Sequence, residues 1–186
     1  VNTGVISSAG SLTAIAGGSI TNALPQGVGG PVPIISAVNN VNLLANSLIN
    51  SGLITSALGN INIGPQLAQS FNLVNSGTLQ ASTGAINIGN ISMKAQDVLN
   101  VVGGDYLSQR LNLEAGAGSI QAMLGTVSGT VRAHGSAANV CTSGLLNLGR
   151  TCITGDPTFY SLSSINITGP ITVSEALTLL AAGDIT

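Results

Sequence analysis

The residues that could do acid–base chemistry are few in this chain and lie far apart. The only histidine is His134, in the stretch VRAHGSAANV, and the six carboxylates are Asp97, Asp105, Glu114, Asp156, Glu175 and Asp184. Paired-carboxylate hydrolysis of a glycosidic bond needs two such groups flanking that bond. No two of the acids are close in sequence, so a polysaccharide hydrolase or lyase would have to assemble its site from distant segments. We predict no enzyme.

Nucleophilic and cofactor chemistry also lack their usual motifs. The sequence contains no Gly-x-Ser-x-Gly turn to present a serine beside His134, and no Gly-Lys-Ser/Thr loop to bind phosphate. Among many serines, none is singled out as the partner of a Ser-His-acid triad. We therefore interpret His134 as a solvated loop histidine, and we predict no catalytic, cofactor-binding or metal-binding residue.

The two cysteines form a close pair in the sequence. Cys141 and Cys152 flank the stretch TSGLLNLGRT, with no histidine or acid at the spacing of a zinc site. We predict a disulfide between them, which would close a short loop in an oxidising compartment. Two buried free thiols are the alternative, because connectivity is not visible in sequence.

Composition excludes several classes of partner. Charged residues make up 5% of the 186 residues and aromatic residues 2%, against roughly 25% charged in a typical soluble domain. The net charge of -2 offers no basic surface for nucleic acid or anionic lipid. No stretch approaches the roughly 18 consecutive apolar residues of a membrane-spanning helix, so we predict no membrane insertion. The start, VNTGVISSAG, lacks the features of a signal peptide, so a secreted protein would be already processed.

Internal repeats decide the architecture. Asn-(Ser/Thr)-Gly followed by apolar residues occurs three times, beginning at Asn2, Asn50 and Asn75. The second and third copies lie about 25 residues apart, which is a typical period for stacked repeats. The motif Gly-x-Ile-Asn-Ile-Gly occurs at 59–64 and 84–89 with the same step. Two unlike motifs that share one period indicate a repeating coil.

A third repeat shows what each unit is. The segments 12–20, 111–120 and 177–185 each read as Leu-x-apolar-x-Ala, a turn containing glycine, then Ser or Asp and Ile. Apolar residues alternate with a period of two, which predicts short strands joined by glycine turns. Frequent glycine and β-branched residues argue against helices. QLAQSFNLV and AQDVLNVV could form brief helical turns, but we favour strands there too.

Strands this short cannot bury a face alone, so we predict that they stack. The predicted fold is all-β, a parallel β-solenoid in which successive turns bury ladders of Ile, Leu, Val and Ala. The 18 asparagines suit corners and stacked amide ladders along the same axis. At 20 to 25 residues per turn the chain makes roughly seven to nine turns, a rod about 35 to 45 Å long.

We predict one solenoid domain over residues 1–186, with two segments that leave the coil. Residues 23–35 carry three of the six prolines. Residues 134–160 run from the histidine through the cysteine pair to GDPTFY. Because loops carry recognition, the second segment is the predicted contact surface if the protein binds a specific ligand.

The repeats VNLLANSLINSGLITSALGNINI, NSGTLQASTGAINIG and LTLLAAGDIT resemble those of filamentous-haemagglutinin-type surface proteins. These are exported by two-partner secretion or as large β-repeat proteins. The resemblance implies a right-handed parallel β-helix, an extracellular or cell-surface location, and a role in adhesion, biofilm matrix or fibres. The family's secretion motif of the type Asn-Pro-Asn-Gly-Ile is missing, so the chain resembles the repeat shaft alone.

Both ends of the sequence fall inside repeats and show no cap, so we expect a solenoid uncapped at both ends. The predicted function is a structural extracellular protein that forms filaments by head-to-tail stacking, its partner being a second copy of itself. The alternative is the shaft of a larger adhesin that binds cells or glycans through residues 141–160. More distant alternatives are an ice-binding solenoid, with hydroxyls from TVSGTV and ITVSEALTL, and a polysaccharide lyase or hydrolase.

Overall fold

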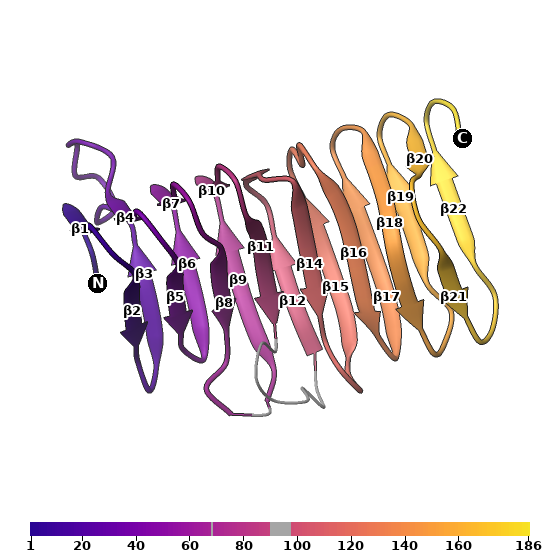
Figure 1. Cartoon of the computed structure of the whole chain (residues 1–186), viewed down its shortest axis with the longest axis horizontal. Helices are drawn as coiled ribbons and strands as arrows, with labels where there is room; N and C mark the ends of the chain where they lie inside the picture. The colour runs from indigo at the N-terminus through magenta and orange to yellow at the C-terminus, as the bar shows by residue number, and fades with distance from the viewer. Residues whose placement is uncertain (68, 90–97) are drawn as a thin grey trace.

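The chain is a β-solenoid of about 7 turns, in which successive turns lie side by side along one axis (Figure 1). The computed structural model describes residues 1–67, 69–89 and 98–186. No residue of these ranges is helical, and the paired strands are parallel and in register except at one bulge, opposite Arg132. The all-β solenoid predicted from the repeats is confirmed. The strands favoured in the two ambiguous stretches are also confirmed, as Phe71–Asn75 and Val98–Val102. Ala68 and residues 95–97 of those stretches lie outside the described residues.

Three sheets form the walls of the coil, and neighbouring strands in each come from successive turns. Sheet 1 contains β1 (Val5–Ser8), β4 (Ile34–Ala37), β7 (Leu53–Ser56), β10 (Thr78–Ala81) and β13 (Asp105–Leu107). Sheet 2 contains β2 (Leu12–Ile15), β5 (Val41–Leu44), β8 (Ile61–Gly64), β11 (Ala85–Gly89), β14 (Arg110–Glu114), β16 (Thr130–Gly135), β18 (Leu146–Ile153), β20 (Ile165–Ile167) and β21 (Ile171–Val173). Sheet 3 contains β3 (Ser19–Asn22), β6 (Ser47–Asn50), β9 (Phe71–Asn75), β12 (Val98–Val102), β15 (Ser119–Leu124), β17 (Ala137–Thr142), β19 (Thr158–Ser161) and β22 (Thr178–Ala181).

The length of one turn changes along the chain. In the middle it matches the predicted period, because Asn50 lies 25 residues before its stacked partner Asn75. Further on, Asn147 and its partner Asn166 are only 19 residues apart. Turns this short also occur before sheet 1 ends at β13, since Ile34 pairs with Leu53 and Val41 pairs with Ile61. The 25-residue repeat is therefore a property of the central turns.

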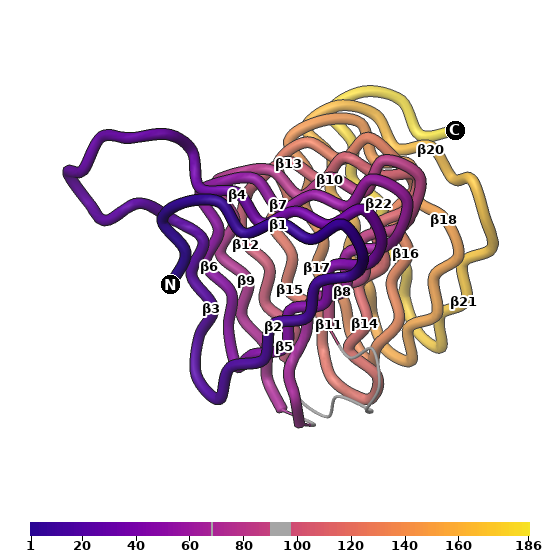
Figure 2. Tube along the Cα trace, turned by 60° about the vertical axis from the view of Figure 1, so that its left-hand side comes forward, coloured from indigo at the N-terminus to yellow at the C-terminus, as the bar shows by residue number. Residues whose placement is uncertain are grey.

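The two predicted departures from the coil have different outcomes. Residues 23–33 form a loop between β3 and β4 that stands out from the coil (Figure 2), and regular structure resumes at Ile34. Residues 134–160 are regular coil instead of a loop, because β16 to β19 cover most of this segment. Its side chains keep the inward and outward alternation of a strand, with Ala138, Val140 and Thr142 buried.

Aliphatic side chains fill the interior, and they sit at every second position. In β5, for example, Val41 and Leu43 are buried while Asn42 faces outward. The largest buried side chains are Tyr106, Phe71 and Phe159. The Tyr106 hydroxyl donates a hydrogen bond to the Gly103 carbonyl (2.7 Å). Burial of this phenol raises the pKa of Tyr106 well above its ordinary value, because the interior disfavours the charged form.

A ladder of buried asparagines explains the Asn-(Ser/Thr)-Gly repeat. Asn2, Asn22, Asn50 and Asn75 stack at the corner between sheets 3 and 1. The Nδ2 of each of the first three donates to the Oδ1 of the next at 2.7 to 2.8 Å. In the three Asn-(Ser/Thr)-Gly copies the asparagine Oδ1 also accepts a hydrogen bond from the glycine amide two residues later, as Asn50 does from Gly52 (3.3 Å). The asparagine of each motif therefore closes its own turn and bonds to the adjacent coil.

Candidate functional site

A row of outward-facing asparagines runs along sheet 2. Asn62, Asn87 and Asn112 lie on β8, β11 and β14, and each Nδ2 donates to the Oδ1 of the asparagine before it. The Asn112–Asn87 bond is 2.6 Å long and the Asn87–Asn62 bond 2.7 Å. Parallel in-register pairing produces this row, because it places equivalent side chains directly beside one another. The outer face of sheet 2 thus carries a continuous polar track.

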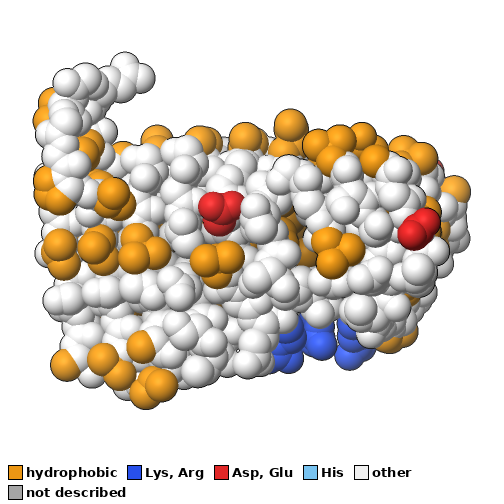
Figure 3. Space-filling view, turned by 90° about the horizontal axis from the view of Figure 1, so that it is seen from above, with side chains coloured by type: hydrophobic (Ala, Val, Ile, Leu, Met, Phe, Trp, Pro, Cys, Tyr) orange, Lys and Arg blue, Asp and Glu red, His pale blue; other side chains and the backbone are white. Residues whose placement is uncertain are grey.

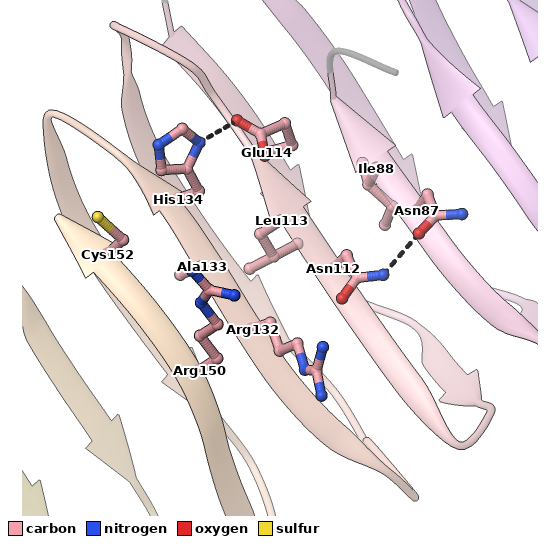
Figure 4. Close-up of a pocket in the computed structure, with 10 residues that line it drawn as sticks. All are labelled: Asn87, Ile88, Asn112, Leu113, Glu114, Arg132, Ala133, His134, Arg150 and Cys152. Atoms are coloured by element: carbon pink, nitrogen blue, oxygen red, sulfur yellow. Dashed lines mark hydrogen bonds and ion pairs between the residues drawn. The ribbon is translucent and has the colours of Figure 1, made fainter. Parts of the chain in front are cut away.

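Arginines extend this track on the next two turns. Arg132 of β16 pairs in register with Asn112. On β18 the register shifts between Val131 and Ala133, so two residues, Gly149 and Arg150, lie opposite Arg132. Such a bulge re-aims the side chains of the strand that carries the extra residue. It brings Arg150 onto the outer face beside Arg132, as Figure 4 shows.

A second row lies next to the first. Glu114, His134 and Cys152 occupy equivalent positions on β14, β16 and β18. Glu114 Oε1 lies 2.5 Å from His134 Nδ1, and it also accepts a hydrogen bond from the Gly116 amide (3.0 Å). The side chains of His134 and Glu114 are 54% and 38% exposed, so this pair is solvated and contributes little to stability.

The two rows line a groove of about 610 Å³ on the outer face of sheet 2 (Figure 4). Its charges do not balance. The groove contains Arg132 and Arg150, whereas Glu114 is its only acid and is hydrogen-bonded to His134. Within the part of the chain that the structure describes, neither arginine forms an ion pair. The groove is therefore a cationic site on an otherwise charge-poor surface.

The basic side chains visible in Figure 3 gather in one place on the solenoid. They are arginines, because Arg110, Arg132 and Arg150 on β14, β16 and β18 are the basic residues that the structure describes. No motif in the sequence points to them. The signal that could have found them is their spacing of about one late turn, which places them on three adjacent strands of one sheet.

The residues considered for chemistry are mostly scattered. Among the acids, only Glu114 forms an ion pair within the described ranges, and Asp97 lies outside them. Those ranges contain no group of three or more His, Cys, Asp or Glu side chains that could hold a metal ion. His134 differs from the prediction, because it lies on strand β16 and is bonded to Glu114 instead of sitting in a solvated loop.

The predicted disulfide between Cys141 and Cys152 is absent, and both cysteines are free. Cys141 lies on β17 in sheet 3, whereas Cys152 lies on β18 in sheet 2. Each side chain faces outward from its own sheet, flanked by buried neighbours such as Val140 and Ile153. Two outward directions on different sheets do not converge, and a disulfide requires converging Cβ atoms.

We expect the native protein to react with a thiol reagent at two cysteines per chain, without reductant or denaturant. Cys152 is exposed and Cys141 only partly so, and the reaction should therefore have a fast and a slow phase. The Cys152→Ser variant should lose the fast phase and keep the slow one. A native chain that shows no free thiol, and whose mass is lower by two hydrogens, would contradict the structure.

No helix long and apolar enough to cross a bilayer occurs in the described ranges. No protein-family model, curated protein or solved structure matches this chain. Its likeness to a β-helix repeat protein therefore lies in the solenoid of about 7 turns, which the repeats predicted.

Proposed function

We propose that this chain is a structural segment of an extracellular fibre, a solenoid that lengthens by stacking of further coils on its ends. The observation that carries the proposal is the direction of its hydrogen bonds. In all three sheets the backbone bonds join one turn to the next, parallel to the solenoid axis. Continuous ladders of this kind resist bending and extension, as a load-bearing shaft requires.

The end faces of the chain favour such stacking. Ile6 in the first turn pairs with Ile35, yet it is 46% exposed whereas Ile35 is 3% exposed. At the other end Ile185 is 47% exposed, and its bridge partner Ile165 is fully buried. The rows of inward-facing core residues therefore end in exposed side chains at both end faces. A further coil would bury these rows, whether it belongs to a longer polypeptide or to a second copy.

Low charge is compatible with association. The chain has six acids and four bases over its whole length, so repulsion between copies is weak. The extracellular or cell-surface location is supported by the resemblance to filamentous-haemagglutinin-type repeats. The proposal assigns the chain no catalytic activity and no cofactor.

Electron microscopy and light scattering of the purified chain test this proposal. We expect rods one solenoid wide that lengthen as protein concentration rises. The Ile6→Lys/Ile185→Lys variant should remain monomeric, because a lysine on each end face opposes edge pairing. A matched control is Met123→Lys, which adds charge at a 65% exposed position on β15 and should assemble normally. Wild-type protein that stays monomeric at every concentration would contradict the proposal.

A further inference from the structure

We propose that the groove on the outer face of sheet 2 binds a linear acidic polysaccharide, with Arg132 and Arg150 paired to its carboxylates. This inference goes beyond the fibre function and does not depend on it. Its starting point is the placement of charge: two of the few basic residues in the chain lie beside each other on adjacent turns, lining one groove.

Neither arginine stabilises the fold through an ion pair with another described residue. Two like charges on neighbouring strands repel each other, and that arrangement is unfavourable without a counter-ion. The one carboxylate of the groove, Glu114, is engaged by His134. Arg132 Nε is buried and has no hydrogen-bond acceptor among the described residues. Burial of this atom holds the guanidinium stem against the sheet, which reduces the entropy lost when a ligand binds.

The chemistry of the groove points to carboxylates on a chain of sugars. A guanidinium offers a planar fork of N–H donors that matches a carboxylate. Adjacent turns are about 4.8 Å apart, so the two forks recur at a short interval along the axis. A polyuronate carries a carboxylate on each sugar, so its negative charges also recur at a short interval along the chain.

The asparagine track supports a sugar chain lying along the axis. Asn87 and Asn112 line the same groove and continue away from the arginines towards Asn62. Each asparagine amide has a second N–H and a second lone pair with which to bond sugar hydroxyls. The groove lining contains no Phe, Tyr or Trp, and its one ring, His134, is bonded to Glu114, so it lacks the aromatic platforms typical of sites for nucleic-acid bases.

Binding of oligogalacturonate to the purified chain tests the inference, with its methyl ester as a neutral match of the same skeleton. We expect the acid form to bind and the ester to bind at least tenfold more weakly. Added salt should weaken the acid form, because the paired charges are exposed. Equal binding of acid and ester would overturn the proposal. So would a sulfated polysaccharide or single-stranded DNA of equal charge that binds tenfold more tightly than the uronate.

The variant Arg132→Gln/Arg150→Gln locates the site. Neither arginine side chain is part of the core, so the fold should persist in this variant. An unchanged circular dichroism spectrum and an unchanged thermal midpoint would verify this. We expect oligogalacturonate affinity to fall about tenfold, since each exposed ion pair contributes up to about fivefold. Arg110→Gln is the control: it removes one positive charge from β14, outside the groove lining, where the double variant removes two, and it should change affinity less than about threefold.

An Arg110 control that costs half as much binding free energy as the double variant, or more, would overturn the site, because each charge would then count equally wherever it lies. Rod assembly is measured separately. A double variant that assembles normally but no longer binds uronate supports this inference, whatever the outcome for the fibre proposal.

Discussion

Replacing Gly77 with alanine is expected to destabilise the solenoid by about 3 kcal/mol or more. Gly77 follows the buried Asn75 at the corner where β9 leads into β10, and it stacks on Gly52 of the previous turn. A Cβ atom at Gly77 would lie 2.1 Å from the Gly52 carbonyl oxygen and 2.8 Å from its amide nitrogen. These are backbone atoms, so relief requires the two turns to separate.

Separation of the turns would strain bonds on both sides of the corner. The Gly52 carbonyl accepts a hydrogen bond from Thr78 (2.9 Å), and the Gly77 carbonyl accepts one from Asp105 in the following turn (3.0 Å). We expect the thermal midpoint to fall by roughly 10 °C, at 2 to 4 °C for each kcal/mol in a chain of this size.

The matched control for Gly77 is Gly144→Ala, in the turn after β17, where an added Cβ has open space around it. We expect this substitution to change the free energy of unfolding by less than about 1 kcal/mol. Urea unfolding followed by circular dichroism measures both variants. Similar stabilities of Gly77→Ala and Gly144→Ala would contradict the close approach of the two turns at this corner.

Asn50→Ala is expected to cost about 3 kcal/mol of unfolding free energy, because it removes the centre of the buried asparagine ladder. The Asn50 side chain is fully buried. Its Nδ2 donates to Asn75 Oδ1 and its Oδ1 accepts from Asn22 Nδ2, both at 2.8 Å. Deletion leaves one donor and one acceptor buried without these partners, and each orphaned group costs about 1 to 3 kcal/mol.

Asn62→Ala is a matched control, since Asn62 also makes two side-chain bonds in a ladder, to Asn42 and Asn87. That ladder lies on the outer face of sheet 2, where the freed amides can bond to water. We expect a loss below about 1 kcal/mol for Asn62→Ala. Chemical denaturation of both variants provides the comparison, and losses of equal size would show that burial of the inner ladder is not what makes it costly to break.

The fold could be predicted because its strongest signals are local. Alternation in stretches such as VNLL follows from a strand with one buried face. The glycines after Asn50 and Asn75 follow from the close approach of the preceding turn. The loop at 23–33 could also be predicted, because prolines cannot donate hydrogen bonds to a sheet.

The prediction of a loop over residues 134–160 is wrong because it rests on unusual residue types instead of on the alternation of buried and exposed positions. Cys141 and Tyr160 are rare types in this chain, and Pro157 indicated a loop. In the structure Cys141 and Tyr160 pair in register on β17 and β19, and Pro157 merely precedes β19. The alternation of Ala138, Val140 and Thr142 was present in the sequence throughout.

The disulfide and the arginine groove could not be predicted, because both depend on which wall of the coil a residue occupies. Separation along the chain does not show that Cys141 and Cys152 lie on different sheets. The position of Arg150 beside Arg132 depends on a one-residue bulge in β18. A bulge shifts register without leaving a clear mark in a degenerate repeat.

The central claim is that successive turns pair in parallel and in register along the axis. Nuclear Overhauser contacts between backbone protons test it most directly. We predict contacts between Ile61 and Ile86, and between Ile86 and Leu111, which pair on β8, β11 and β14. Contacts between opposing α-protons of consecutive strands, such as β10 and β11, would indicate antiparallel hairpins and would contradict the solenoid.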